Sequence, residues 1–407
     1  MTHRLVLRLA VAFSLSLLVL GTSTTLAQNA PRPPATPAAS SVAAEGSLTL
    51  GSLSTIDTAG QPMTISPDGK WLAGAGPDKD FCIWKVETLE PMCASDRRPM
   101  PVQHETVTWA PDSSAVAFSL DAAKLLVDSD IYVMDIDGTL HDLTDDGPND
   151  KISLQGGGSA VPIDMYPAWS PDSTQLVFAR TTWGGDSRGT TLAVVDRTGG
   201  EVSERFVVSG QEPFIIYSPM HWLDDGSVIF SVLHADTANS QNGVWRLTAS
   251  GGVERILAGD KTSTVPMPFV NDVSPDGRTA TVFSFLLAGQ FANDGTPAFF
   301  ILDLETGETV PVEAANPEPG ARIVSAGTFL PDGSSVLSVQ MNGGAVSFVL
   351  SGLDGTVLGS ADLPDQAPPP STYRGFSIAA DGTAFVPTLA GGEAGGRGGL
   401  LVTVAGA

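Results

Sequence analysis

Apolar and polar residues alternate over short stretches along the chain, and turn-forming residues interrupt the alternation at regular intervals. The stretch MYPAWSPDSTQLVFAR (165–180) shows the unit: aromatic residues lead into Ser-Pro-Asp, and a short apolar run follows. Alternation with a period of two predicts half-buried β-strands. Pro suits the second position of a type I turn, and Asp and Gly suit its later positions. The unit therefore predicts two strands joined by a tight turn.

This turn recurs seven times. Its Asp residues are Asp68, Asp112, Asp172, Asp225, Asp276, Asp332 and Asp381, which lie 44 to 60 residues apart. A period of this size is typical of propellers and solenoids. Ser113 and Ser173 replace the turn Gly in two repeats, which predicts slight backbone strain there.

The positions around each turn Asp are apolar in every repeat. The residues three positions before each turn Asp are, in chain order, Ile65, Trp109, Trp169, Trp222, Val273, Phe329 and Ile378. The residues four positions after each turn Asp are, in the same order, Leu72, Val116, Leu176, Ile229, Ala280, Val336 and Phe385. We predict that all fourteen are buried positions of two antiparallel strands.

Two further strands follow in each repeat, as in DIYVMDIDG (130–138) and TLHDLT (139–144). Four antiparallel strands repeated seven times predict an all-β fold, a seven-bladed β-propeller. The last repeat holds only three strands. The alternating segment 47–55 is therefore predicted to complete the seventh blade beside 399–405 and to remove an open sheet edge.

Two of these segments carry a family resemblance. YPAWSPDSTQLVFA and DIYVMDIDG resemble the repeats of TolB-like propellers, and CIWKVETLEPMC resembles a WD-repeat strand pair. The resemblance covers residues 46–407 and implies the propeller fold. TolB also carries an N-terminal α/β domain, whereas here a Pro- and Ala-rich segment precedes the repeats. The role of TolB in binding an outer-membrane lipoprotein is therefore not carried over.

The N-terminal residues predict export. Arg4 and Arg8 precede an apolar run from Leu9 to Leu20, and Thr25-Leu26-Ala27 fits a small-residue cleavage site. Residues 1–27 are predicted to be a secretory signal peptide, with an uncleaved anchor as the alternative, and residues 28–45 a disordered tether. The protein is then secreted, periplasmic or at the cell surface, with no transmembrane helix in the mature chain.

Charge limits the partners. The chain has 45 acidic and 21 basic residues, a formal charge of −24, and removal of residues 1–27 takes away two Arg and leaves −26. Such a chain repels nucleic acid and anionic lipid. We expect no nucleic-acid partner and a monomeric protein.

The two cysteines, Cys82 and Cys93, are predicted to lie on neighbouring strands, slightly offset from one another. In an oxidising compartment they can form a disulfide, with Cα atoms about 4.4–6.8 Å apart. Two separate small core residues are the alternative.

Known catalytic patterns are absent or misplaced. GDSRG (185–189) matches G-x-S-x-G, but Ser187 falls in a loop between two strands of a blade and not on a strand-to-helix elbow. The His residues show no clustering suited to a metal. The sequence therefore assigns no catalytic residue, no metal and no cofactor.

The candidate ligand-binding residues follow from the loops and the channel. Long loops fall on one face, tight turns on the other, and binding residues favour loops on a rigid scaffold. Four residues before each turn Asp the side chain is small, except at His221 and Asp272. These two are predicted to hydrogen-bond, with the acid raising the His pKa, as a staple between blades four and five or as a channel site. His104, Tyr166 and Arg374 are expected nearer the long-loop mouth.

Two functions are compatible with this pattern. The first is an extracytoplasmic binding or scaffold module that presents its long-loop face to a protein or carbohydrate ligand. The alternative is a propeller enzyme of the polysaccharide lyase or hydrolase type, with a site in the central channel. Small residues along the channel favour the binding module, because such enzymes gather His, Arg and acids on their inner strands.

Overall fold

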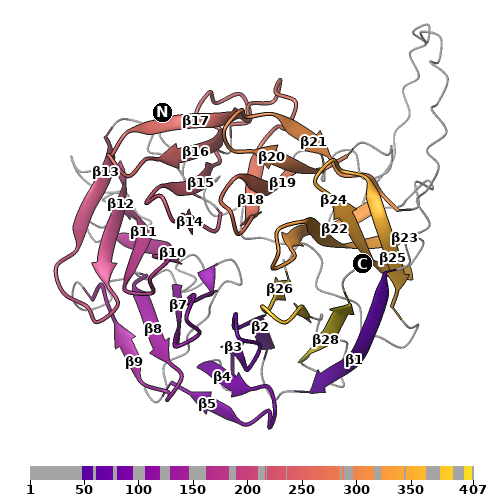
Figure 1. Cartoon of the computed structure of the whole chain (residues 1–407). Coiled ribbons are helices and arrows are strands. Elements are labelled where there is room, and N and C mark those ends of the chain that lie inside the picture. Colours follow the sequence, from indigo (N-terminus) through magenta and orange to yellow (C-terminus); the bar gives the residue numbers. More distant parts are fainter. Residues whose placement is uncertain are drawn as a thin grey trace, which may run out of the picture.

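The computed structural model contains seven four-stranded antiparallel sheets, which form a ring of blades around a central channel (Figure 1). This confirms the predicted seven-bladed propeller. The structure describes residues 48–57, 61–76, 80–94, 106–119, 129–145, 162–182, 189–209, 216, 218–234, 236–284, 287, 297–315, 322–342, 345–363, 376–387 and 398–405. Over these ranges, no helix is long and apolar enough to cross a membrane.

The first four blades run along the chain, each from an inner to an outer strand. Blade one contains β2 (Gln61–Ile65), β3 (Trp71–Ala75), β4 (Phe81–Lys85) and β5 (Pro91–Cys93). Blade two contains β6 (Thr108–Trp109), β7 (Ala115–Ser119), β8 (Ile131–Asp135) and β9 (Leu140–Asp142). Blade three contains β10 (Ile163–Trp169), β11 (Gln175–Thr182), β12 (Gly189–Asp196) and β13 (Ser203–Ser209). Blade four contains β14 (His221–Trp222), β15 (Val228–Val232), β16 (Gly243–Leu247) and β17 (Val253–Ala258).

The last three blades complete the ring. Blade five contains β18 (Pro268–Val273), β19 (Thr279–Ser284), β20 (Phe299–Asp303) and β21 (Thr309–Pro311). Blade six contains β22 (Arg322–Phe329), β23 (Ser335–Asn342), β24 (Ala345–Gly352) and β25 (Val357–Asp362). Blade seven contains β26 (Ser377–Ile378), β27 (Thr383–Pro387), β28 (Gly398–Ala405) and, as its outermost strand, β1 (Thr49–Asp57).

The two ends of the described chain meet in blade seven. β1 pairs antiparallel with β28, so the segment that precedes blade one covers the edge of the last blade (Figure 1). Two hydrogen bonds then join blade seven to blade one: the Ile65 N–H donates to Ser377 Oγ at 2.8 Å, and the Ala380 N–H donates to Pro67 O at 2.7 Å.

The turn Asp has the same structural role in all seven blades. One oxygen of its carboxylate accepts the backbone N–H of the residue two positions later, at 2.8–3.1 Å. Such a local bond stabilises a turn because the side chain takes the place of a backbone acceptor. The recurring Asp is therefore explained by folding alone.

Burial follows the predicted pattern with three exceptions. The seven positions four residues after the turn Asp are all 0% exposed. The exceptions are among the residues three positions before the turn Asp. Trp222, Val273 and Ile378 are half-buried there, whereas the sequence predicts full burial. Trp222 and Val273 lie beside a cavity, which accounts for their partial exposure.

The hairpins of blades four and seven are one residue shorter than the others. Leu223 bonds to Ser227 and Ala379 to Thr383, whereas in blade three Ser170 bonds to Gln175 across one more residue. In blade four Trp222 therefore pairs with Val228 and His221 with Ile229. The two shorter hairpins are also the two that lack Pro in the turn.

Ser113 and Ser173 have the left-handed backbone that the sequence predicts, with φ of 62° and 61°. Each also makes a contact that glycine cannot make. Ser113 Oγ accepts the N–H of Asp68 at 3.0 Å, and Ser173 Oγ accepts the N–H of Asp112 at 3.1 Å. The strained residues therefore join neighbouring blades.

Cys82 and Cys93 form a disulfide with a Cα–Cα distance of 4.0 Å. They lie directly opposite each other on β4 and β5, so the predicted offset is wrong. Directly opposed residues on antiparallel strands have close Cα atoms, which explains a distance shorter than we predicted.

Candidate ligand site at the channel mouth

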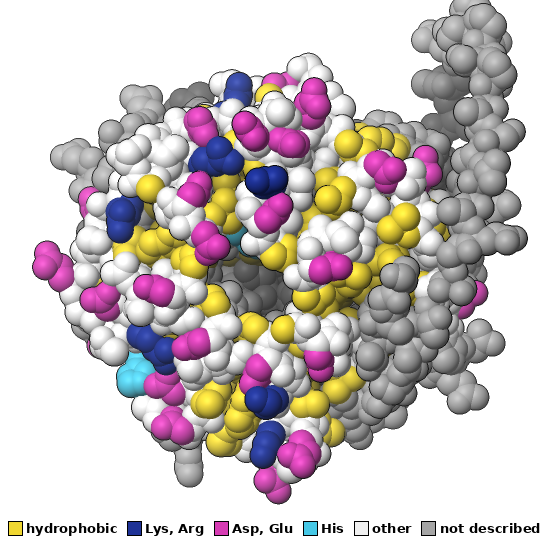
Figure 2. Space-filling view, in the orientation of Figure 1, with side chains coloured by type: hydrophobic (Ala, Val, Ile, Leu, Met, Phe, Trp, Pro, Cys, Tyr) yellow, Lys and Arg dark blue, Asp and Glu magenta, His cyan; other side chains and the backbone are white. Residues whose placement is uncertain are grey.

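Two cavities lie along the propeller axis and share several lining residues, among them Thr108, Trp109 and His221. One, of about 500 Å³, is lined by residues from or beside the inner strands of all seven blades and is the central channel. The other, of about 590 Å³, lies at the mouth of the channel, between the first hairpin turns of blades two to five. We call the second one the mouth cavity. Hydrophobic and acidic side chains rim the hollow at the centre of the ring (Figure 2).

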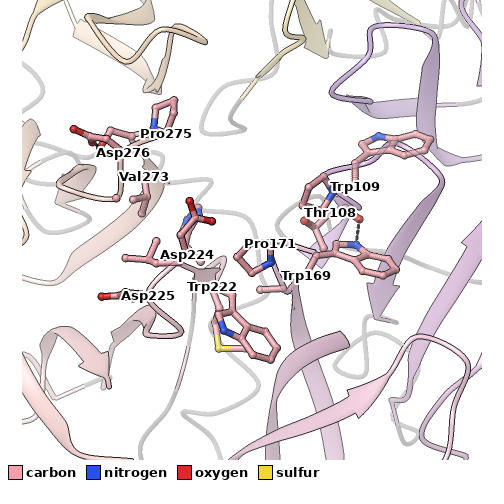
Figure 3. Close-up of a pocket in the computed structure, with 17 residues that line it drawn as sticks. Thr108, Trp109, Trp169, Pro171, Trp222, Asp224, Asp225, Val273, Pro275 and Asp276 are labelled. Atoms are coloured by element: carbon pink, nitrogen blue, oxygen red, sulfur yellow. Dashed lines mark hydrogen bonds between the residues drawn. The ribbon is translucent and has the colours of Figure 1, made fainter. Parts of the chain in front are cut away.

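Three tryptophans from consecutive blades line the mouth cavity. Trp109 and Trp169 are 8% and 5% exposed, and Trp222 is half-buried. Trp169 Nε1 donates to the carbonyl of Thr108 at 3.1 Å, which fixes its ring against blade two (Figure 3). Trp109 Nε1 is buried without a hydrogen-bond partner among the described residues.

Acidic side chains stand on one side of the mouth cavity. Its lining includes Asp224, Asp225 and Asp276 but no Lys or Arg. Asp224 and Trp222 lie between Pro275 and Asp276 on one side and the other two tryptophans on the opposite side (Figure 3). The Ser274 hydroxyl, and then the Arg278 N–H, hold the pKa of Asp276 below its ordinary value.

His221 and Asp272 both line the channel, as the sequence predicts, but their predicted hydrogen bond is not formed. Asp272 instead accepts two backbone N–H groups, from Val273 to Oδ1 and from Phe329 to Oδ2, both at 2.9 Å. The carboxylate therefore joins blade five to blade six. His221 Nε2 is buried and has no hydrogen-bond partner among the described residues.

The pKa values of this pair move in the directions that burial dictates. Burial lowers the pKa of His221 to about 4, so the predicted upward shift is wrong. Burial raises the pKa of Asp272 to about 7, although the N–H groups of Phe329 and Val273 oppose the shift. A low-dielectric site disfavours the charged form of either group. At neutral pH the His221 side chain is therefore uncharged.

Of the other three candidate residues, the structure describes Tyr166. Tyr166 is 3% exposed and packs in the hydrophobic cluster of blades two to four, at a β-bulge of β10 with φ of 56°. His104 and Arg374 lie outside the described residues, as do most of the long loops. The described residues therefore do not test the predicted role of the long-loop face, whereas the mouth cavity lies among the tight turns, which the sequence places on the opposite face.

The sequence pattern did not single out Asp224 or the mouth cavity. A signal was present, because Asp224 occupies the place of the turn Pro in a hairpin that is one residue short. Comparing the turns position by position would have identified blades four and seven as the two exceptions, and blade four as the one with an acid at this place.

One group of potential metal ligands lies close together in the described part of the chain. It consists of Asp80, Cys82 and Cys93, whose potential ligand atoms lie within 4.8 Å of one another. Both sulfurs of this group are bonded to each other, so they are not available as thiolate ligands.

Comparison with known proteins identifies the fold. No family model and no curated protein matches the sequence. Among solved structures, an oligogalacturonate lyase in complex with manganese matches with a TM-score of 0.55 and 13% identity, over 88% of this chain and 98% of that chain. The oligogalacturonate lyase of Vibrio parahaemolyticus matches with a TM-score of 0.55 and 14% identity, over 89% and 99%.

TolB from Acinetobacter baumannii also matches, with a TM-score of 0.42 and 18% identity, over 77% of this chain. The chain spans 63% of the length of that TolB. The two lyase structures are similar to this chain as β-propellers, and at these identities the likeness is one of fold alone.

Proposed function

We propose that this protein is an extracytoplasmic binding module and that its ligand, a protein segment or a carbohydrate, binds in the mouth cavity. The observation that carries the proposal is the cavity of about 590 Å³, lined by three tryptophans, several turn prolines and three aspartates. Ligand sites are concave and mostly apolar, with a few polar groups that orient the ligand. Tryptophan is also among the residues that dominate binding energies.

The proposed location rests on two features. The N-terminal sequence has the charged start, apolar run and small residues of a signal peptide. The Cys82–Cys93 disulfide supports an oxidising compartment.

An enzyme is the second candidate, because two oligogalacturonate lyases match almost over their full lengths. The chemistry of the mouth cavity argues against their substrate there. Galacturonate oligomers carry one carboxylate per sugar, and three aspartates without a Lys or Arg line this cavity. Like charges repel in a partly desolvated site. An assay for unsaturated product by ultraviolet absorbance, with tetragalacturonate and added manganese, tests this alternative.

Calorimetric titration tests the binding proposal. The purified protein, as the cell processes it, is titrated with pentalysine, pentaglutamate, cellopentaose and tetragalacturonate. We expect at least one probe to bind and Trp222→Ala to weaken it about 10-fold, the loss typical of a buried aromatic anchor. Leu358→Ala is the matched control, because Leu358 is an exposed hydrophobic residue on β25 of blade six, 37% exposed.

Trp222→Phe provides a second variant in case the alanine variant is unstable. The proposal is wrong if no probe binds, or if the bound probe binds both Trp222 variants as tightly as it binds the unaltered protein.

A further inference from the structure

We propose that the mouth cavity selects a ligand with a positively charged amine or guanidinium group, and that Asp224 is the carboxylate that receives it. This inference rests on the proposed function, because it names the ligand class for the same cavity.

Asp224 breaks the pattern of the repeats. The residues immediately before the turn Asp are Pro67, Pro111, Pro171, Asp224, Pro275, Pro331 and Ala380. The backbone of the turn does not require a carboxylate at this place. In blade seven, Ala380 occupies it in a hairpin of the same length, so blade four carries an acid that folding does not explain.

The carboxylate of Asp224 is available to a ligand. The turn Asp residues around the mouth each use an oxygen to accept a backbone N–H, as Asp225 does from Ser227 at 2.8 Å. Asp224 makes no such bond with any described residue, and it is exposed and lines the cavity. In the view of Figure 3, Asp224 lies between Pro275 and Asp276 on one side and Trp109 and Trp169 on the other.

No positive charge of the described chain neutralises this carboxylate. Among the residues that line the mouth cavity there is no Lys or Arg. Arg278, which is not part of the lining, pairs with Asp276 at 3.9 Å, with both side chains mostly exposed. A cavity lined by one sign of charge raises the local concentration of ligands of the opposite sign.

Two neighbours of Asp224 suit a cationic ligand. Trp222 is half-buried and lines the same cavity, and an indole ring attracts cations to its face. His221 lines both cavities and is uncharged at neutral pH, so it does not repel a cation. Its unpartnered Nε2 is a further polar atom in the wall of the site, whereas the unpartnered Nε1–H of Trp109 is a donor and does not bind the cation itself.

The test compares charged and uncharged forms of one probe by calorimetry. We expect pentalysine to bind, to bind more weakly as salt is raised, and to lose binding when its side chains are acetylated. Asp224→Asn and Asp224→Ala should each weaken pentalysine binding about 5- to 10-fold, as expected for loss of one partly exposed charge next to an aromatic ring.

The matched control is Glu305→Gln. Glu305 is an exposed carboxylate in the turn after β20 of blade five, outside the cavity lining but on the same face of the propeller. We expect this variant to change the affinity less than about 2-fold, because distant exposed charges are screened. Spermine is a second cationic probe: tighter binding of spermine indicates a polyamine, and tighter binding of pentalysine a basic peptide, and either result supports the inference.

The inference is overturned if both Asp224 variants bind pentalysine as the unaltered protein does, or if the acetylated peptide binds equally well. If cellopentaose binds in a Trp222-dependent way and neither cation binds, this inference fails while the proposed function stands. If no probe depends on Trp222, both fail.

Discussion

Asp272 shows how one channel-facing side chain joins two blades. It stands four residues before its turn Asp, and its Oδ2 accepts the N–H of Phe329 in the next blade. Ser377 has the same place in blade seven and accepts the N–H of Ile65 in blade one at 2.8 Å. The Ser377 hydroxyl therefore joins blade seven to blade one in the same way that the Asp272 carboxylate joins blade five to blade six.

The carboxylate should make stability depend on pH. Because the folded pKa of Asp272 is raised to about 7, its contribution to stability is fully present below its unfolded value and is lost as pH rises through 7. Relative to Asp272→Ser, the unaltered protein should lose about 2 kcal/mol of unfolding free energy between pH 4.5 and pH 8. This loss is smaller than the free energy equivalent to the whole pKa shift, because solvent in the channel screens the charge.

Urea unfolding of both proteins at the two pH values measures this difference. His221 titrates in both proteins, so its own contribution cancels in the comparison. Parallel pH profiles for the two proteins would show that Asp272 titrates normally.

Ser173 predicts an unusual order of substitutions. Its φ of 61° favours glycine, whereas its Oγ accepts the N–H of Asp112. Ser173→Gly relieves strain but loses the hydrogen bond, while Ser173→Ala keeps the strain and loses the bond. We expect Ala to be less stable than Gly by about 1 kcal/mol, the reverse of the order in a regular strand. Equal stabilities in urea unfolding would contradict this.

At the scale of elements, β1 has the largest expected effect. It covers β28 along its length and is the outermost strand of blade seven. Deleting residues 46–56 should expose the edge of β28, bury less apolar surface and lower the unfolding free energy by roughly 3 kcal/mol or more. Deleting residues 28–40 is the control and should leave the unfolding free energy unchanged. Equal thermal stability of the two deletion proteins would disprove a structural role for β1.

The sequence was sufficient to predict these elements because each hairpin repeats one turn. Pro and Asp fix the backbone of the turn, and period-two alternation fixes the faces of the strands. Alignment on Asp alone could not reveal that the hairpin of blade four is one residue shorter. For that reason the register of Trp222 and its partial exposure were missed.

At the scale of the whole molecule, the site depends on differences between blades. His221 and Asp272 could be located in the channel because they replace small residues in a repeated position. Their interactions could not be predicted, since the backbone N–H groups of Phe329 and Val273 compete for the carboxylate. The mouth cavity required four adjacent blades to be assembled before its lining was visible.

The central claim is that the ligand binds in the mouth cavity, and hydrogen–deuterium exchange tests this directly. Exchange is compared with and without the tightest-binding probe of the panel, in the unaltered protein and in Asp224→Ala. We predict slower exchange at residues 220–228 and 271–279, which flank the mouth cavity, and a smaller effect in the variant. Slower exchange confined to residues 120–128 and 183–188, which the sequence predicts to be long loops, and equal in both proteins would contradict binding in the mouth cavity.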